Sequence, residues 1–278
     1  MLLRLGNLLL TRSDSARLVT LSYDRISGGY DDAWTRHMRD KTLLLIDALG
    51  DIQGCDALDL TCGTGYATGL LAQRTGRMAT GIDASGGMLD AAVANCGDSC
   101  RFVRSDVLEF LKSQPSRSLD IITCCWGLGY SRPLDVLRQC RRLLRKGGRL
   151  AVIDNSIFSL REVMYCSFLT FLEQPEKLAN LMKFRFLTGA AQFRLWLFLA
   201  GLKSIQSSNG RKSYLAADGK EAIARLTATG AAAGFEYASP EQDSGQIFSR
   251  FAQIIEDRCL TNEGIEIIHR FYMGIAVK

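Results

Sequence analysis

The sequence lacks the patterns that most often mark metal centres and disulfide frameworks. Its 278 residues include only two histidines, and its nine cysteines form no C-x-x-C pair. Cys96 and Cys100 could form a metal pair, but no second pair or nearby histidine supports it. Because several cysteines lie inside apolar, strand-like runs, we interpret them as reduced, buried thiols. The sequence therefore predicts no metal site and a cytoplasmic protein.

Long apolar runs and concentrated charge are also scarce. The apolar stretch at 1–10 is too short to span a bilayer, and Arg4 interrupts it. We expect a helix with Leu2, Leu5 and Leu9 on one face, packed on the protein itself or on a subunit partner. The net charge of +5 is mild and its basic residues are dispersed, which argues against a nucleic-acid partner.

One stretch, ALDLTCGTGYATGLLA at 57–72, organises the rest of the chain. Its first four residues are typical of a buried parallel strand, and the composition from Tyr66 onward favours a helix. Gly63 and Gly65 lie between them, where the absence of a Cβ lets the backbone approach a ligand closely. The first turn of the helix also presents free N–H groups. This pattern predicts a nucleotide-type binding loop.

Strands and helices then alternate along the chain. Apolar strands are predicted near 57–61, 78–82, 101–104, 119–125 and 149–154, and helices near 65–75, 86–95, 106–113 and 133–144. Such alternation predicts an α/β fold with a mostly parallel, Rossmann-like sheet covered by helices on both faces. Ligands bind such sheets at the carboxyl ends of the strands.

Acidic residues occur at three of these strands. Asp59 lies within the first strand, where it could meet an ammonium group of a ligand. Asp83 follows the second strand and could accept hydrogen bonds from both hydroxyls of a ribose. Asp106 follows the third strand and could accept a proton from an adenine amine, with Val107 against the ring. Alternatively, Asp106 caps its own helix and Asp83 caps the turn at Ser85.

The glycine spacing separates two classes of nucleotide ligand. Dinucleotide enzymes require G-x-G-x-x-G, whereas here Thr68 stands at the third position and Gly69 comes one residue later. Three acids could bind an amine, a ribose and an adenine, and S-adenosylmethionine carries all three of these groups. The pattern therefore favours S-adenosylmethionine over NAD.

Several segments together resemble the class I S-adenosylmethionine-dependent methyltransferases. LDLTCGTG is similar to their first motif, GIDASGGMLDAA to their second, and LRQCRRLLRKGGRLAVID to the helix and turn before strand five. The tail FYMGIAVK resembles their last strand, and SYDRISGGYDDAW resembles a flap found in their quinone and small-molecule branches. The sequence departs from the family at Lys146, where proline is common, and at Thr61, where glycine or alanine is commoner.

The resemblance implies a seven-stranded sheet with an antiparallel last strand, and S-adenosyl-L-methionine as cofactor. It also implies roles for residues around the glycine loop and at the end of strand four. The implied cofactor-binding residues are Tyr23, Asp59, Thr61, Cys62, Gly63, Gly65, Asp83, Ala84, Met88, Asp106, Val107 and Cys125. The implied acceptor-binding residues are Trp126, Tyr130 and Phe184, although Trp126 could also be a core aromatic.

The resemblance makes the flap a contact region. Tyr23 and Tyr30 would close over the sulfonium, because aromatic faces attract cations; the alternative is a helix, a glycine turn and a second helix with structural roles only. His37, just after the flap, is a candidate general base, needed only if the acceptor must lose a proton. Tyr30 is the other catalytic candidate, through its contact with the site. A lone histidine is more often structural than catalytic.

About 60 residues separate Asp154 from the next family-like element, a helix predicted at Gly219–Ala233, and this interval is too long for a bare loop. Seven of the thirteen phenylalanines lie between Ile157 and Ile205, and we expect a helical cap insertion above the acceptor site, or equally a sub-core or homodimer interface. Its lysines and arginines suit a solvated surface or the face of an anionic membrane. The predicted regions are N-terminal helices and flap (1–54), cofactor-binding core (55–154), helical cap (155–217) and the end of the core (218–278).

Three functions compete at this point. The first is methyl transfer to a small, apolar acceptor such as a quinone, phenol or lipid. The second is a non-catalytic subunit that binds S-adenosylmethionine or lipid. The third is an NAD-dependent oxidoreductase, which the glycine spacing disfavours.

Overall fold

The computed structural model describes residues 8, 15–231 and 233–278 of the chain. The helix expected to carry Leu2, Leu5 and Leu9 lies outside these residues. The chain forms two compact units. The core unit comprises Thr35–Phe158, Phe184–Gly210 and Arg270–Lys278, and the accessory unit comprises the remaining segments, Met1–Trp34, Ser159–Lys183 and Arg211–His269.

The sheet contains eight strands in the part of the chain that the structure describes. Their bounds are β1 (Ala57–Leu60), β2 (Ala79–Asp83), β3 (Cys100–Arg104), β4 (Leu119–Cys125), β5 (Leu144–Asn155), β6 (Lys203–Ala216), β7 (Leu260–Thr261) and β8 (Gly264–Val277). Seven follow one another in the order β3-β2-β1-β4-β5-β8-β6, and β7 pairs with β8 beside this path. The first five strands run parallel, and β8 runs antiparallel to β5. The predicted Rossmann-like sheet and its antiparallel last strand are confirmed.

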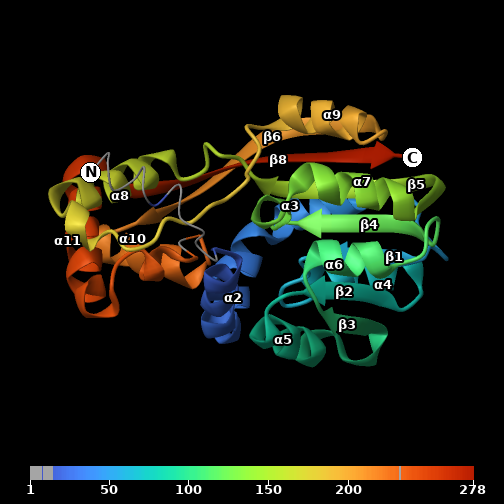
Figure 1. The fold of residues 1–278 in the computed structure, drawn as a ribbon, viewed down its shortest axis with the longest axis horizontal. Coiled ribbons are helices and arrows are strands. Elements are labelled where there is room, and N and C mark those ends of the chain that lie inside the picture. Colours follow the sequence, from blue (N-terminus) through green and yellow to red (C-terminus); the bar gives the residue numbers. More distant parts are fainter. Residues whose placement is uncertain (1–7, 9–14, 232) are drawn as a thin grey trace. The chain divides into compact units, whose positions relative to one another are not determined.

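Helices cover both faces of this sheet (Figure 1). In the core unit they are α3 (Arg36–Asp47), α4 (Tyr66–Thr75), α5 (Gly86–Cys96), α6 (Val107–Ser113), α7 (Pro133–Leu143) and α9 (Ala190–Leu199). The helices predicted near 65–75, 86–95, 106–113 and 133–144 correspond to α4 to α7 with small shifts at their ends. The helix ends have local signals: α4 and α5 are followed by Gly76 and Gly97, Asp106 caps α6, and α7 begins at Pro133.

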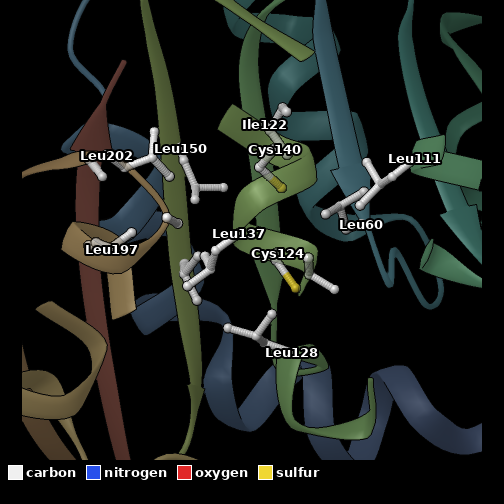
Figure 2. Packing of buried hydrophobic residues seen from close by; sticks show 14 of the residues in the cluster. Leu60, Leu111, Ile122, Cys124, Leu128, Leu137, Cys140, Leu150, Leu197 and Leu202 are labelled. Atoms are coloured by element: carbon white, nitrogen blue, oxygen red, sulfur yellow. The ribbon is translucent and has the colours of Figure 1, made fainter. Parts of the chain in front are cut away.

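Alternation along β1 explains which helices lie on which face. Leu58 and Leu60 point into the main hydrophobic core with α6, α7 and α9, whereas Asp59 points to α4 on the other face. Figure 2 shows Leu137 and Cys140 of α7 lying against side chains from the strands, with Leu197 of α9 nearby. Burying these apolar side chains supplies most of the stabilisation of the unit.

The predicted helical cap is helical only in part. The interval contains α8 (Arg161–Glu173) and α9, but it also contains the fourteen-residue strand β6 at the end of the sheet. The sequence of β6 is polar, half of its side chains are exposed and only Ala216 is buried, so it carries no apolar run that predicts a strand. Its place is fixed by β8: a Cβ on Gly210 would lie 2.4 Å from the ring of Phe271.

The accessory unit has a separate hydrophobic core. It contains α2 (Ser15–Ile26), α8, α10 (Gly219–Ala228) and α11 (Glu241–Cys259), and α11 packs against both α8 and α10. Phe251, Ile254 and Ile255 of α11 lie in this core with Leu226 of α10 and Val163 of α8. The sequence predicted α10, extended to residue 233, and did not predict α11. None of the helices that the structure describes has the length and apolar character to cross a membrane.

Two glycines of the accessory unit provide a matched test of this packing. A Cβ on Gly219 would lie 2.0 Å from the carbonyl oxygen of Ala252 in α11, whereas a Cβ on Gly245 would meet nothing within 4 Å. Gly219→Ala should therefore lower the free energy of unfolding by about 1–3 kcal/mol, the usual cost of overpacking. Gly245→Ala should raise it by about 0.5–1 kcal/mol, because glycine weakens a helix interior.

Urea unfolding of both variants checks this prediction. Equal stabilities for the two variants would contradict the close approach of α10 and α11.

Candidate functional site

The glycine loop joins β1 to α4 in a conformation that glycine favours. Thr61, Gly63 and Gly65 have φ of 55°, 53° and 87°. A Cβ on Gly65 would lie 2.9 Å from Cys96 Sγ, whereas a Cβ on Gly63 would meet no protein atom within 4 Å. Gly65 is therefore required by packing, while the backbone of Gly63 is open to a ligand.

Thr61 stands at a left-handed position despite its branched side chain. Its hydroxyl donates to the Leu60 carbonyl oxygen at 2.5 Å, and a Cβ on Gly127 would lie 2.4 Å from it. The side chain of Thr61, after β1, thus fills the space left by the missing side chain of Gly127, after β4. Cys62 is buried beside Thr61, its amide donates to Ile82, and burial raises the pKa of its thiol well above the ordinary value.

Asp59 lies beneath the loop and is fully buried. Its two carboxylate oxygens accept hydrogen bonds from Thr68 Oγ1 at 2.7 Å and Thr123 Oγ1 at 2.5 Å. Burial raises the pKa of Asp59 to about 6, against the effect of these two bonds. The carboxylate therefore ties α4 and β4 to β1, and its expected contact with a ligand ammonium group stays a prediction.

Asp83 holds the loop from the end of β2. Its Oδ2 accepts from the Gly63 amide at 2.9 Å, and its Oδ1 accepts from the Ser85 amide at 2.9 Å. The half-buried carboxylate and the open backbone of Gly63 thus lie side by side. The cap at Ser85 that the sequence left open is present, and the ribose role of Asp83 stays a prediction.

The residues implied for the adenine lie at the ends of β2 and β3. Asp106 is exposed, and its Oδ1 caps α6 by accepting from the Leu108 and Glu109 amides. Val107 is 8% exposed, Met88 is fully buried in α5, and Ala84 is exposed. The capping role of Asp106 is present, and adenine contacts of these residues stay predictions.

Trp126 follows β4 with φ of 68° and is 9% exposed. Its indole N–H donates to Thr42 Oγ1 of α3 at 2.9 Å, and its ring lies edge-on to Phe271. These contacts are those of the core aromatic considered from the sequence, so an acceptor contact of Trp126 stays a prediction. Cys125, just before it, has its pKa raised well above the ordinary value by burial and by nearby Asp59.

Three aromatic rings gather next to the end of β4. Tyr130, in the short turn Leu128–Tyr130, lies edge-on to Phe184 and Phe186, with ring centroids 5.6 and 5.5 Å away. Phe184 and Phe186 are 5.3 Å apart, and Phe184 is 37% exposed. We call Tyr130, Phe184 and Phe186 the aromatic trio. The sequence named Tyr130 and Phe184 as acceptor-binding residues, and it placed Phe186 among the phenylalanines expected to line the cap, with Phe168 and Phe171.

Asp154 anchors this trio and was not predicted as a site residue. Its Oδ2 accepts from the Gly129 amide at 2.7 Å, and the Gly129 carbonyl accepts from the Arg185 amide at 2.8 Å. Asp154 therefore fixes the turn that carries Tyr130 and, through Gly129, the segment that carries Phe184. An acid at the carboxyl end of the fifth strand was the available signal, since it repeats the pattern of the other strands.

The residues of the expected flap belong to different units. Tyr23 and Tyr30 lie in the accessory unit with ring centroids 5.9 Å apart, and a Cβ on Gly230 would lie 2.8 Å from the ring of Tyr23. His37 lies half-buried on α3 of the core unit. Contact of the tyrosines with a cofactor, and catalytic roles for Tyr30 and His37, stay predictions.

Asp154 gives a pH-dependent prediction. Burial raises its pKa from 3.8 to about 7 although the Gly129 and Asn155 amides lower it. The folded protein thus binds the proton more tightly than the unfolded chain, so this contribution to stability is complete below about pH 4 and is lost as pH rises through 7. Relative to Asp154→Asn, the wild-type free energy of unfolding should fall by up to about 1.4 kcal/mol per pH unit in this window.

Urea titrations of both proteins between pH 4 and 8 measure this difference, and Asp59, present in both, cancels. Parallel pH profiles would contradict the raised pKa of Asp154.

Comparison with known proteins addresses the family. Residues 57–148 match the model of a family described as "Methyltransferase domain". A demethylmenaquinone methyltransferase of Thermotoga maritima is 31% identical over 133 residues, which cover 46% of this chain and 53% of that protein. A malonyl-[acyl-carrier protein] O-methyltransferase of Dechloromonas aromatica is 36% identical over 145 residues, covering 51% and 52%. The chain thus spans about half the length of the curated relatives it matches.

Solved structures agree on the fold. A protein of Bacillus halodurans described as a candidate methyltransferase superposes with a TM-score of 0.59 at 15% identity, covering 86% of this chain and 99% of that one. At this identity the likeness concerns the fold alone. The family match includes β1, the glycine loop and Asp83, which are the elements that form the site described above. Over residues 57–148 the chain therefore contains a methyltransferase domain.

Proposed function

We propose that this protein transfers a methyl group from S-adenosylmethionine to a small, apolar acceptor. The observation that carries the proposal is the pairing of Gly63 with Asp83. No protein atom lies within 4 Å of the place where a side chain of Gly63 would project. The carboxylate of Asp83 accepts a hydrogen bond from the Gly63 amide at 2.9 Å. A close backbone approach beside a carboxylate is what the polar part of an adenosine ligand requires.

The residues present fit the cofactor that the family implies. Bound S-adenosylmethionine supplies a methyl group already activated on a sulfonium, so no metal or redox centre is required of the protein for the transfer itself. Gly63 leaves room for a ligand, Asp83 offers acceptor oxygens for hydroxyl groups, and the N-terminal turn of α4 presents backbone N–H groups. Asp59 supports this arrangement from below by holding α4 and β4 to β1.

The aromatic trio supports an apolar acceptor. Tyr130 lies in the short turn five residues after the end of β4. The carboxyl ends of β1 and β4, which run parallel, lie at the same edge of the sheet, so Tyr130 and the glycine loop follow the same edge. Aromatic faces bind flat or long apolar groups by burying their area and excluding water. The relatives act, by their names, on a demethylmenaquinone and on malonyl-[acyl-carrier protein]. Of these two chemistries, the trio favours the apolar one.

The proposed function predicts which cofactor the protein binds. S-adenosylhomocysteine, the demethylated product, should bind at micromolar concentrations, and NAD should not bind. Asp83→Ala should weaken the binding of S-adenosylhomocysteine by about 1.5–3 kcal/mol, the range for a hydrogen bond to a charged group. Asp90→Ala, which removes an exposed carboxylate of α5, is the control and should leave the affinity unchanged.

Isothermal titration calorimetry measures all four affinities. An Asp83→Ala variant that folds and binds as tightly as wild type would exclude Asp83 from the cofactor site. Binding of NAD in place of S-adenosylhomocysteine would overturn the proposed function.

The proposed function also predicts how the rate depends on the acceptor. Each buried CH₂ contributes about 0.8 kcal/mol, so kcat/KM should rise with the length of a prenyl or acyl chain until the site is filled. Phe184→Ser should raise KM for a long-chain acceptor about tenfold or more and change KM for a short one little. The control Met78→Ser removes an exposed apolar side chain just before the amino end of β2, where no effect is expected.

Methyl transfer to a series of quinones or phenols of increasing chain length, followed by mass spectrometry, checks this prediction. A flat chain-length profile with a folded wild-type protein would end the lipophilic-acceptor proposal and leave methyl transfer to a polar acceptor.

A further inference from the structure

α9 exposes an apolar face that the core does not use. Phe193 and Leu197 are fully buried and hold the helix to the sheet, with Phe193 against Tyr272. On the other side, Leu195, Phe198 and Leu199 are 53%, 76% and 51% exposed. The spacing of these three residues, i, i+3 and i+4, places them on one helical face. Phe198 is the most exposed of the large apolar side chains in the described part of the chain.

Three cationic residues lie on α9 or on the segments next to it, and acids are missing from the segment that forms the helix. No aspartate or glutamate occurs between Glu176 and Asp218, a stretch with six lysines and arginines after Lys177. Arg194 lies on α9 itself and donates to Ser207 of β6 at 3.0 Å, and Lys203 is exposed at the start of β6. Arg141 of the neighbouring α7 donates to the Gly201 carbonyl at 3.0 Å, at the end of α9.

Two occupants would cover the apolar residues, and the charges separate them. A second copy of this chain seated face to face would bring two positively charged segments together at low dielectric, which is unfavourable. A surface of anionic lipid headgroups is complementary to the same cations, while the hydrocarbon below it accepts Phe198 and its neighbours. Aromatic residues with flanking lysine and arginine are the usual side chains at a membrane interface.

We propose that α9 docks the protein on an anionic membrane surface, with Leu195, Phe198 and Leu199 entering the interface and Arg194, Lys203 and Arg141 contacting phosphate headgroups. The helix lies on the membrane and does not cross it, because its ten residues are too few and its other face is buried in the core. This contact is independent of methyl transfer and of the identity of the acceptor.

The test is co-sedimentation of the full chain with vesicles of equal parts phosphatidylcholine and phosphatidylglycerol, and with vesicles of phosphatidylcholine alone. Wild type should bind the mixed vesicles and lose affinity with added salt and on phosphatidylcholine alone. Phe198→Gln should weaken binding about tenfold, and Arg194→Gln about fivefold. Val93→Gln, which removes an exposed apolar side chain of α5, should bind as wild type does.

Circular dichroism establishes that each variant is folded, and S-adenosylhomocysteine affinity should be unchanged in Phe198→Gln, which separates this proposal from the proposed function. The proposal is overturned if wild type does not bind the mixed vesicles, if it binds both kinds of vesicle equally, or if Phe198→Gln binds as tightly as wild type. A dimer in analytical ultracentrifugation that Phe198→Gln dissociates would also overturn it, because α9 would then be a subunit interface.

Discussion

The carboxylate of Asp59 joins three elements on which the site is built. It lies in β1, and its oxygens accept from Thr68 of α4 and Thr123 of β4. A buried carboxylate is costly unless its oxygens are hydrogen-bonded, so the two threonines and Asp59 stabilise one another only when all three elements are in place. The glycine loop lies directly above this contact, and its conformation depends on the positions of β1 and α4.

Small and large residues are matched around the loop. Thr61 occupies the space that a side chain at Gly127 would need, and Cys96 occupies the space that a side chain at Gly65 would need. Of the three glycines Gly63, Gly65 and Gly127, only Gly63 has no such neighbour. Two of these glycines are thus explained by packing and one by access to the backbone, which is why a glycine pattern alone is a weak indicator of ligand binding.

Two apolar surfaces lie outside the glycine loop, and different contacts fix their positions. The aromatic trio is fixed by Gly129, whose amide is bound by the buried Asp154. The apolar face of α9 is fixed only by the opposite side of its own helix, which is buried against the sheet. The first arrangement suits recognition of a defined acceptor, because its rings are preorganised. The second suits a fluid surface such as a lipid bilayer.

The sequence by itself determined the parallel strands β1 to β5, the helices between them and the cofactor loop, because each has an apolar period or a glycine that depends on local geometry. It did not reveal β6 or α11. The strand is polar and half exposed, and its place depends on β8, which begins at Gly264, 48 residues after β6 ends at Ala216. Nor did it separate the roles of the acids. Asp59, Asp83 and Asp154 all end or occupy apolar strands, yet only Asp83 adjoins open backbone, whereas Asp59 and Asp154 are fully buried. Burial and hydrogen-bond partners are set by segments distant in the chain, so only the tertiary structure decided which carboxylates are fully buried and which one adjoins the open backbone of Gly63.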